Sequence, residues 1–452
     1  MLLLFAVTTS ALVVQPPAMS RPVSLLKAST LAAETLPLTP EEQRLHFESV
    51  VQTTYGRYPI TITRGAGCEL FDDTTGKSYL DFVAGIATCC LGHADERLAK
   101  AVSDQMRKVH HVSNLYYIPE QGRLAQWLTE SLQTEGCDYR AFFCNSGGEA
   151  NEAALKLAYK HAVIERDLER PVILTAYGSF HGRTMATISA TAQPKYHGPK
   201  GVWKIQDRFD HFAYNDVESL RAAFRKHEKL GGVAAVLIEP LQGEGGVVNG
   251  DADFFKALRQ ECDDTGALLM FDEVQCGVGR TGKMWGHQHF HGIAPDVLTC
   301  AKAIGGGVPL GAMLAKASCD VLKPGDHATT YGGNPLACAA GLAVASAIED
   351  DNLIGNARTR GDQLAAGLLR LVQDYPDKLS EVRGRGLLRG LKLAHPQASA
   401  LVQLCADEGL LLVPAGPDVL RFVPPLVVSE LQINAALDIL ETALAKLELP
   451  SE

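Results

Sequence analysis

The chain has 452 residues, of which 46% are hydrophobic and 21% charged, and its formal net charge is −10. This length and composition are ordinary for a globular protein with a large core, and they allow two or more domains. The acidic balance argues against a nucleic-acid partner, because nucleic-acid-binding proteins carry a basic stripe. After the N-terminus no apolar run reaches the ~18 residues that a membrane span needs, so we expect no membrane association of the mature chain.

The N-terminal 33 residues differ from the rest. Residues 1–14 are apolar, the next residues carry Arg21 and Lys27, and the first acidic residue is Glu34. This order predicts a targeting extension over residues 1–33 that is removed in the mature protein. A bipartite plastid signal fits the order, and a mitochondrial matrix presequence is the alternative. A merely disordered tail is the third, less favoured interpretation.

The following residues, up to about 133, predict short elements of both kinds. We expect a helix over residues 40–55, then a β-branched segment at residues 60–63. Residues 71–82 predict a hairpin that turns at Thr75-Gly76. Helices are expected over residues 95–109 and 119–133.

From about residue 141, short apolar runs alternate with helical segments. The strand candidates are residues 172–177, 233–240, 267–274, 296–302 and 309–315. Runs without polar interruption are typical of a parallel sheet covered on both faces. Helices at 335–349 and 353–373 and a mixed α/β segment at 380–448 follow.

These elements predict a division into domains. We expect residues 34–85 to form an N-terminal arm that packs with a small domain, residues 86–340 to form a large domain, and residues 341–452 to form the small domain.

Three features suggest a common site. Ser146-Gly147-Gly148 precedes a strongly helical run. Glycines let the backbone approach an anion, and the free N–H groups of a helix start favour phosphate, although many such turns merely cap helices. Asp272 ends an apolar strand, where ligands of α/β proteins bind. A carboxylate there suits the protonated ring nitrogen of pyridoxal phosphate (PLP), but strand-end acids also cap helices or bind metals.

Lys302 is the third feature. It follows another apolar strand and precedes Ala-Ile-Gly-Gly-Gly. Small neighbours let a flat cofactor approach, and burial lowers the pKa of a lysine toward the range that imine formation and proton transfer need.

Other motifs in the chain carry less information. HQHFH (287–291) has no acid or cysteine beside it, so we interpret it as surface histidines and expect no metal site. GRGLLRG (384–390) imitates a dinucleotide fingerprint but lacks its spacing. The 11 cysteines include no Cys-x-x-Cys pair, which favours free thiols in a reducing compartment.

The chain resembles the class III (ω-amino acid) aminotransferases from about residue 48 to 448. The matching motifs are TYGRYPI (54–60), YLDFVAGIATCCLGH (79–93), FFCNSGGEANEAALKLA (142–158), SFHGRT (179–184), IEPLQGEGGV (238–247), LMFDEVQCGVGRTG (269–282), LTCAKAIGGGVPLGA (298–312), TTYGGNPLAC (329–338) and LRFVPPL (420–426). The resemblance implies fold type I of the PLP-dependent transferases, with a large, mostly parallel-sheet domain and a smaller α/β domain.

The resemblance also assigns roles at the cofactor. Lys302 is expected to hold PLP as a Schiff base, and Asp272 to pair with its ring nitrogen. Ser146, Gly147 and Gly148 are expected to hold the phosphate, with Thr330 reaching across from the neighbouring subunit of a homodimer. The remaining cofactor contacts are expected from Phe180, Val274 and Gln275.

Further roles concern the substrates. Arg183 is expected to bind the α-carboxylate, because its guanidinium can hold a carboxylate bidentately. Thr329 and Tyr58 are expected beside the substrate. Glu244 and Arg421 match a gate in which the glutamate covers the arginine until the second carboxylate of 2-oxoglutarate arrives. A permanent structural ion pair is the alternative.

Ile86 bears on the amino donor. It stands just after FVAG, where ornithine aminotransferases carry a pocket tyrosine, and the missing hydroxyl favours an acylated nitrogen. The expected reaction converts N2-acetylornithine and 2-oxoglutarate to N-acetylglutamate 5-semialdehyde and glutamate, a step of arginine biosynthesis. Ornithine, succinylornithine and 4-aminobutyrate stay open as donors. An aminomutase that makes 5-aminolevulinate and a non-catalytic binding protein are rival interpretations.

Overall fold

The computed structural model describes residues 39–132, 136–204 and 207–450, and its contacts divide the chain into two units that meet between Thr61 and Ile62. The targeting extension predicted for residues 1–33 lies outside the described residues. In the first unit, helix α2 spans Pro40–Val50 and ends before the predicted residue 55. Its start is fixed by a capping box, in which Thr39 accepts from the N–H of Glu42 and the Glu42 carboxylate accepts from that of Thr39.

The second unit begins with the predicted hairpin. Strands β1 (Arg64–Ala66), β2 (Glu69–Asp72) and β3 (Lys77–Asp81) pair antiparallel, and the Asp72 carboxylate accepts the N–H groups of Thr74 and Thr75 in the turn. Strand β15 (Leu410–Leu411) pairs with β3 in parallel. Residues near the C-terminus therefore complete the sheet of residues near the N-terminus. The proposed domain boundaries at residues 85 and 340 stay a prediction.

Three helices connect this sheet to the central one: α3 (Ala84–Ala87), α4 (Glu96–Lys108) and α5 (Pro119–Glu130). The last two confirm the predicted helices. Asp95 caps α4 by accepting from the N–H of Leu98, and Pro119 occupies the first turn of α5, where its missing N–H costs nothing.

The central sheet has seven strands in the order β4-β12-β11-β10-β7-β5-β6. They are β4 (Tyr139–Cys144), β5 (Val172–Ala176), β6 (Phe209–Phe212), β7 (Val233–Ile238), β10 (Leu268–Asp272), β11 (Val297–Cys300) and β12 (Gly311–Lys316). All five predicted strands are present. The parallel arrangement expected for residues 309–315 was wrong, because β12 runs antiparallel to both β11 and β4.

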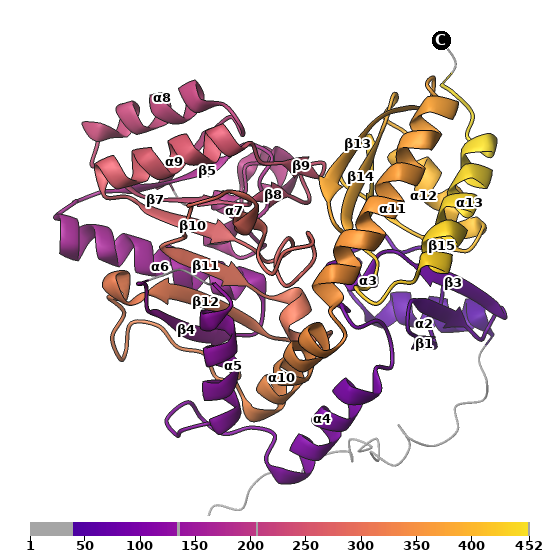
Figure 1. Ribbon diagram of the computed structural model, residues 1–452, viewed down its shortest axis with the longest axis horizontal. Helices are drawn as coiled ribbons and strands as arrows, with labels where there is room; N and C mark the ends of the chain where they lie inside the picture. The colour runs from indigo at the N-terminus through magenta and orange to yellow at the C-terminus, as the bar shows by residue number, and fades with distance from the viewer. Residues whose placement is uncertain (1–38, 133–135, 205–206, 451–452) are drawn as a thin grey trace, which may run out of the picture. The chain divides into compact units, whose positions relative to one another are not determined.

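Helices cover both faces of this sheet, as the continuous apolar runs predicted (Figure 1). Along β10, Leu269 and Phe271 pack in one core with α8 (Val217–Glu228) and α9 (Ala252–Thr265). Leu268 and Met270 point to the other face and pack with α6 (Gly147–Arg166). Short elements lie between these: α7 (Met185–Ala190), β8 (Leu241–Gln242), β9 (Val248–Asn249) and the 3₁₀ turns Pro194–Tyr196, Pro199–Gly201, Gly286–His289, Lys302–Gly305 and Ala317–Cys319.

The C-terminal part is helical and then mixed, as expected. Helices α10 (Pro335–Asp350) and α11 (Leu353–Asp374) are followed by β13 (Leu379–Arg385), β14 (Leu388–Leu393), α12 (Ala398–Asp407), β16 (Val413–Pro414), β17 (Val419–Phe422) and α13 (Glu430–Lys446). Four of these strands form an antiparallel sheet in the order β13-β14-β17-β16. The GRGLLRG motif is the β13–β14 hairpin turn, which explains why its spacing differs from that of a dinucleotide fingerprint. No helix in the described ranges is both long and apolar enough to span a membrane.

Candidate active site

A cavity of about 390 Å³ lies where the ends of β10 and β11 meet the start of α6. Asp272 is the last residue of β10 and pairs in register with Thr299 of the parallel strand β11. Lys302 follows β11 by two residues, so the carboxylate and the amine come from neighbouring strand ends. Both residues line the cavity, together with the Ser146-Gly147-Gly148 turn.

The start of α6 forms one wall. Ser146 caps the helix by accepting from the N–H of Glu149 at 3.3 Å, and the N–H groups of the first helical turn lack partners within the helix. A Cβ on Gly147 would lie 2.6 Å from a methyl carbon of Val274, so only glycine allows the helix start to contact the β10 loop this closely. A Cβ on Gly148 would meet nothing nearer than 3.9 Å. The resulting surface of backbone donors suits a phosphate group.

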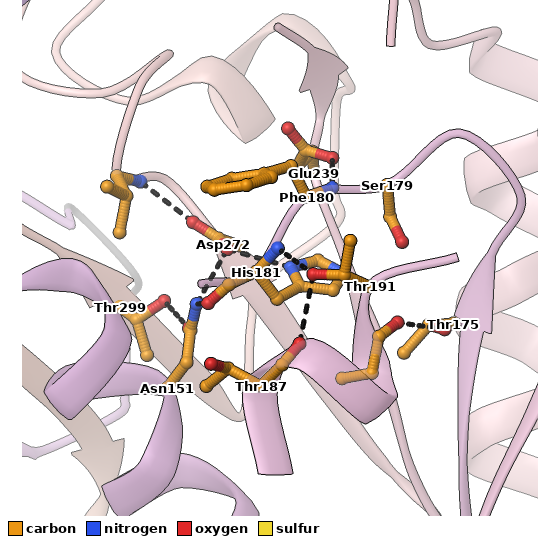
Figure 2. A network of polar contacts seen from close by, with 12 residues as sticks. Asn151, Thr175, Ser179, Phe180, His181, Thr187, Thr191, Glu239, Asp272 and Thr299 are labelled. Atoms are coloured by element: carbon orange, nitrogen blue, oxygen red, sulfur yellow. Dashed lines mark hydrogen bonds and ion pairs between the residues drawn. The ribbon is translucent and has the colours of Figure 1, made fainter. Parts of the chain in front are cut away.

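Asp272 is buried and held by three donors (Figure 2). Its Oδ2 accepts from Asn151 Nδ2 at 2.8 Å and lies 2.8 Å from His181 Nδ1, and its Oδ1 accepts from the N–H of Val274 at 3.0 Å. Thr299 donates to Asn151 in turn. These contacts fix the direction of the carboxylate at the cavity wall.

Lys302 is in the left-handed region, at φ +48°, which is unusual for a lysine. The conformation places the side chain in the cavity. Burial, together with the positive charge of Arg421, lowers the pKa of Lys302 to about 8. About one tenth of the amine is therefore neutral and nucleophilic at pH 7, far more than for an ordinary lysine.

Glu244 and Arg421 form an ion pair, with Arg421 Nη2 2.9 Å from Glu244 Oε2. Arg421 is 1% exposed and also donates to Gln275 Oε1 at 3.0 Å. Because Gln275 lines the cavity, the pair is connected to it by one side chain. Burial acts to raise the pKa of Glu244, but the charge of Arg421 and a hydrogen bond from Tyr196 outweigh it, so this pKa lies below its ordinary value.

The other predicted residues differ in their relation to the cavity. Phe180 and Val274 line it. Arg183 is exposed, with its guanidinium carbon 5.6 Å from the Phe180 ring centre. Thr329 accepts from Asn145 Nδ2 at 3.3 Å, and Asn145 lines the cavity.

Arg183, Thr329, Glu244 and Arg421 are not among the residues that line the cavity, and neither are Thr330 and Ile86. Thr330 is exposed, and Ile86, near the end of α3, is 40% exposed. Tyr58 belongs to the first unit, where it is 43% exposed.

Sequence reasoning missed several functional candidates. Asn151 and His181 hold Asp272, and the buried Glu239 lies on the cavity wall with its carboxylate accepting the N–H groups of Phe180 and Gly243. Burial raises the pKa of Glu239 to about 7. Asn151, His181 and Glu239 all lie inside the motifs that match the family, and this position was the one sign in the sequence that they belong to the site.

The HQHFH motif needs a correction. His287 is 3% exposed and lies 2.9 Å from Glu273 Oε1, so it is not a surface histidine. Glu273 also accepts the N–H groups of Gly286 and His287. Glu273, which follows β10 directly, therefore anchors the start of the motif. No cluster of metal-binding side chains occurs within the parts of the chain that the structure describes.

The cavity residues fit PLP. The start of α6 offers backbone donors for a phosphate, the fixed Asp272 carboxylate suits a protonated pyridine nitrogen, and Lys302 supplies an amine of lowered pKa. Phe180 adds an aromatic ring on the same wall.

Comparisons with known proteins agree with this chemistry. The family model of class-III aminotransferases matches residues 50–444. The chain is 55% identical over 403 residues to the acetylornithine aminotransferase of Nostoc, covering 88% of this chain and 92% of the relative, and 54% identical over 430 residues to that of Synechocystis, covering 94% and 98%. Among solved structures, the ornithine aminotransferase of Toxoplasma gondii is similar with a TM-score of 0.84 at 29% identity, covering 92% of this chain and 97% of that one.

The acetylornithine aminotransferase of Elizabethkingia anophelis has a TM-score of 0.79, also at 29% identity, covering 91% of this chain and all of the other. The fold is that of the fold-type-I PLP-dependent transferases. The chain belongs to the class-III aminotransferases, whose cofactor is PLP.

Proposed function

We propose that the chain is an acetylornithine aminotransferase, which moves the δ-amino group of N2-acetylornithine to 2-oxoglutarate and gives N-acetylglutamate 5-semialdehyde and glutamate. The observation that carries this proposal is the 50–55% identity to several relatives named acetylornithine aminotransferase over most of both chains. Overall shape does not separate the donors, because an ornithine aminotransferase has a TM-score as high as 0.84. The missing hydroxyl at Ile86, a position where ornithine aminotransferases carry a tyrosine, supports the acylated donor.

Lys302 and Asp272 are proposed to carry the chemistry. When bound, PLP supplies an electron sink for the carbon that bears the reacting amine. Asp272 would pair with the protonated ring nitrogen, and Asn151 and His181 hold the Asp272 carboxylate in place. With PLP bound, Lys302 Nζ would hold the cofactor and, when free, would take a proton from the amine-bearing carbon of the donor and serve as the proton donor later in the exchange.

The two substrates require different carboxylate sites. Arg183 is proposed to bind the α-carboxylate of the donor. Arg421 is proposed to bind the second carboxylate of 2-oxoglutarate after Glu244 has moved away, and the direct Glu244–Arg421 contact supports this masking. A masked arginine does not attract the carboxylate of the donor into an unproductive orientation.

A homodimer with shared active sites is also proposed. Thr330 is exposed and is expected to reach the phosphate of the partner subunit. A nearby loop exposes Leu115 (88%) and Tyr117 (104%), and it is tied to the segment after Thr330 through the Asn114–Gly332 hydrogen bond. Exposed apolar side chains next to an exposed threonine are what a subunit interface needs.

The proposed location is a plastid, with the mitochondrial matrix as the alternative. The cyanobacterial origin of relatives such as those from Nostoc and Synechocystis supports a plastid enzyme. The apolar and then basic sequence of residues 1–33 supports a targeting extension.

The donor is tested by half-reactions. The PLP-loaded enzyme is mixed with N2-acetylornithine, succinylornithine, ornithine or 4-aminobutyrate, and the visible absorbance of the bound cofactor is followed. We expect N2-acetylornithine to bleach the band with the highest rate per concentration and 2-oxoglutarate to restore it. Faster bleaching by another donor would contradict the proposed substrate, and turnover without any keto acid would indicate an aminomutase.

A further inference from the structure

Tyr196 contacts both proposed carboxylate sites. Its hydroxyl donates to Glu244 Oε1 at 2.6 Å, while Glu244 Oε2 is paired with Arg421. Its ring lies under Arg183, whose guanidinium carbon is 4.1 Å from the ring centre, and the Phe180 ring meets it edge-on. One side chain thus joins the Glu244–Arg421 pair to the arginine proposed for the donor.

The backbone of Tyr196 is held firmly in place. It ends the 3₁₀ turn Pro194–Tyr196, and its N–H donates to the carbonyl of Gln193. The buried Gln193 amide donates to the carbonyls of Gly178 and Ser179, just before Phe180. The His197 ring lies 2.6 Å from the carbonyl of Thr191. The turn is therefore fixed to the same segment that carries Phe180 and Arg183.

The Tyr196 hydroxyl stays protonated and so remains a hydrogen-bond donor to Glu244. Burial raises the pKa of Tyr196, and the Glu244 carboxylate raises it further, so the hydroxyl stays protonated. Lys195 also approaches Glu244, at 4.0 Å, but its side chain is 48% exposed and the interaction is weak in water. The hydroxyl is thus the main partner that competes with movement of Glu244 away from Arg421.

We propose that Tyr196 is a positioning residue that sets the enzyme's preference between its amino donor and dicarboxylates. Its hydroxyl holds Glu244 over Arg421, and its ring supports Arg183. The proposal rests on the roles given above to Glu244, Arg421 and Arg183, and it adds a residue that controls the balance between them.

Removing the Tyr196 hydroxyl is expected to shift the enzyme toward the state in which Arg421 is unmasked. Tyr196→Phe keeps the ring under Arg183 but removes a hydrogen bond to a carboxylate, so the masked arrangement of Arg421 becomes less favourable. A ligand that needs the unmasked arginine then binds more tightly, in proportion to the fraction of enzyme that is ready for it. A hydrogen bond to a charged group corresponds to about tenfold in an equilibrium constant.

The test compares variants in the two half-reactions of the PLP-loaded enzyme. For Tyr196→Phe we expect kcat/KM with glutamate to rise about tenfold and the KM for 2-oxoglutarate to fall about tenfold, with kcat/KM for the donor unchanged within about twofold. Tyr196→Leu also removes the ring, so kcat/KM for the donor is expected to fall several-fold as well. Tyr159→Phe is the control, because its hydroxyl donates to the Arg208 carbonyl outside the site.

Three outcomes overturn the proposal: an unchanged glutamate half-reaction in a folded Tyr196→Phe enzyme, an equal loss for donor and dicarboxylate, or the same shift in Tyr159→Phe. The half-reaction with glutamate is measured without the amino donor, so its result does not depend on which donor the enzyme uses. If N2-acetylornithine fails to bleach the wild-type enzyme while Tyr196→Phe still shifts the glutamate reaction, the donor assignment is wrong and the role of Tyr196 stands.

Discussion

At the scale of single residues, the site depends on a lysine that shares a buried environment with an arginine. Burial is the largest cause of the lowered pKa of Lys302, and Arg421 is the next. A lysine with a pKa near 8 is about one tenth neutral at pH 7, whereas an ordinary lysine is almost wholly charged. The same arginine that is proposed to bind 2-oxoglutarate thus also prepares the amine.

The titration of Lys302 can be measured directly. In the cofactor-free protein, labelling of the Lys302 peptide by a small amine reagent should rise with pH with a midpoint near 8, because only the neutral amine reacts. Removing the positive charge in Arg421→Gln should move the midpoint upward, while Arg421→Lys should move it less. Labelling is quantified by mass spectrometry of the peptide. A midpoint above 10 in the wild type would show that the amine is solvated.

Some residues of the site could be predicted from sequence and others could not. Lys302, Asp272 and Gly147 each stand where local pattern carries meaning: two strand ends and a glycine turn before a helix. Asn151 and His181 are, by contrast, ordinary polar residues until the fold brings them to Asp272 from 121 and 91 positions away. No local spacing encodes such a contact.

At the scale of elements, the contact between the start of α6 and the loop after β10 sets the shape of the cofactor site. Gly147→Ala would push a methyl group against Val274, whereas the methyl group of Gly148→Ala would make only ordinary van der Waals contact with Thr184. We expect Gly147→Ala to lower the free energy of unfolding by about 1–3 kcal/mol, and to weaken PLP binding because the helix start shifts.

Gly148→Ala is the matched control for stability. Its methyl group has room, and alanine loses less entropy than glycine on folding, so stability should be unchanged or slightly higher. Urea unfolding of the cofactor-free proteins checks both variants. Equal destabilisation by the two substitutions would contradict the described packing.

The sequence pattern predicted where most buried strands lie but not how every strand runs. Continuous apolar runs identified the buried strands, but β6 (FDHF) escaped notice because it lies at the sheet edge and mixes polar with apolar residues. The composition of β12 does not reveal that this strand runs antiparallel to its two neighbours. This direction follows from the connection, since only ten residues separate β11 from β12, fewer than a parallel crossover needs.

At the scale of the whole molecule, the proposed homodimer with shared active sites makes a prediction about mixed dimers. Lys302→Ala should be inactive, and Thr330→Asp should be strongly impaired because its charge repels the cofactor phosphate. In a mixed dimer, the site built on the intact Lys302 would receive the intact Thr330 from the other chain. Co-refolding the two variants should therefore restore activity in the hybrid fraction.

The arrangement within one chain gives the opposite result. If Thr330 served the site of its own chain, every site in the hybrid would carry a lesion and no activity would return. Activity is measured on hybrids separated by two different affinity tags. Mixing each variant with itself supplies the baseline.

The proposed attachment of PLP to Lys302 is tested most directly by trapping it. Reducing the PLP-loaded protein with borohydride makes the attachment permanent, and peptide mass spectrometry then identifies the modified lysine. We expect one cofactor per chain on Lys302, and none on Lys302 when an amino donor is added before the borohydride. Modification of a different lysine, or none in a protein that retains PLP, would contradict it.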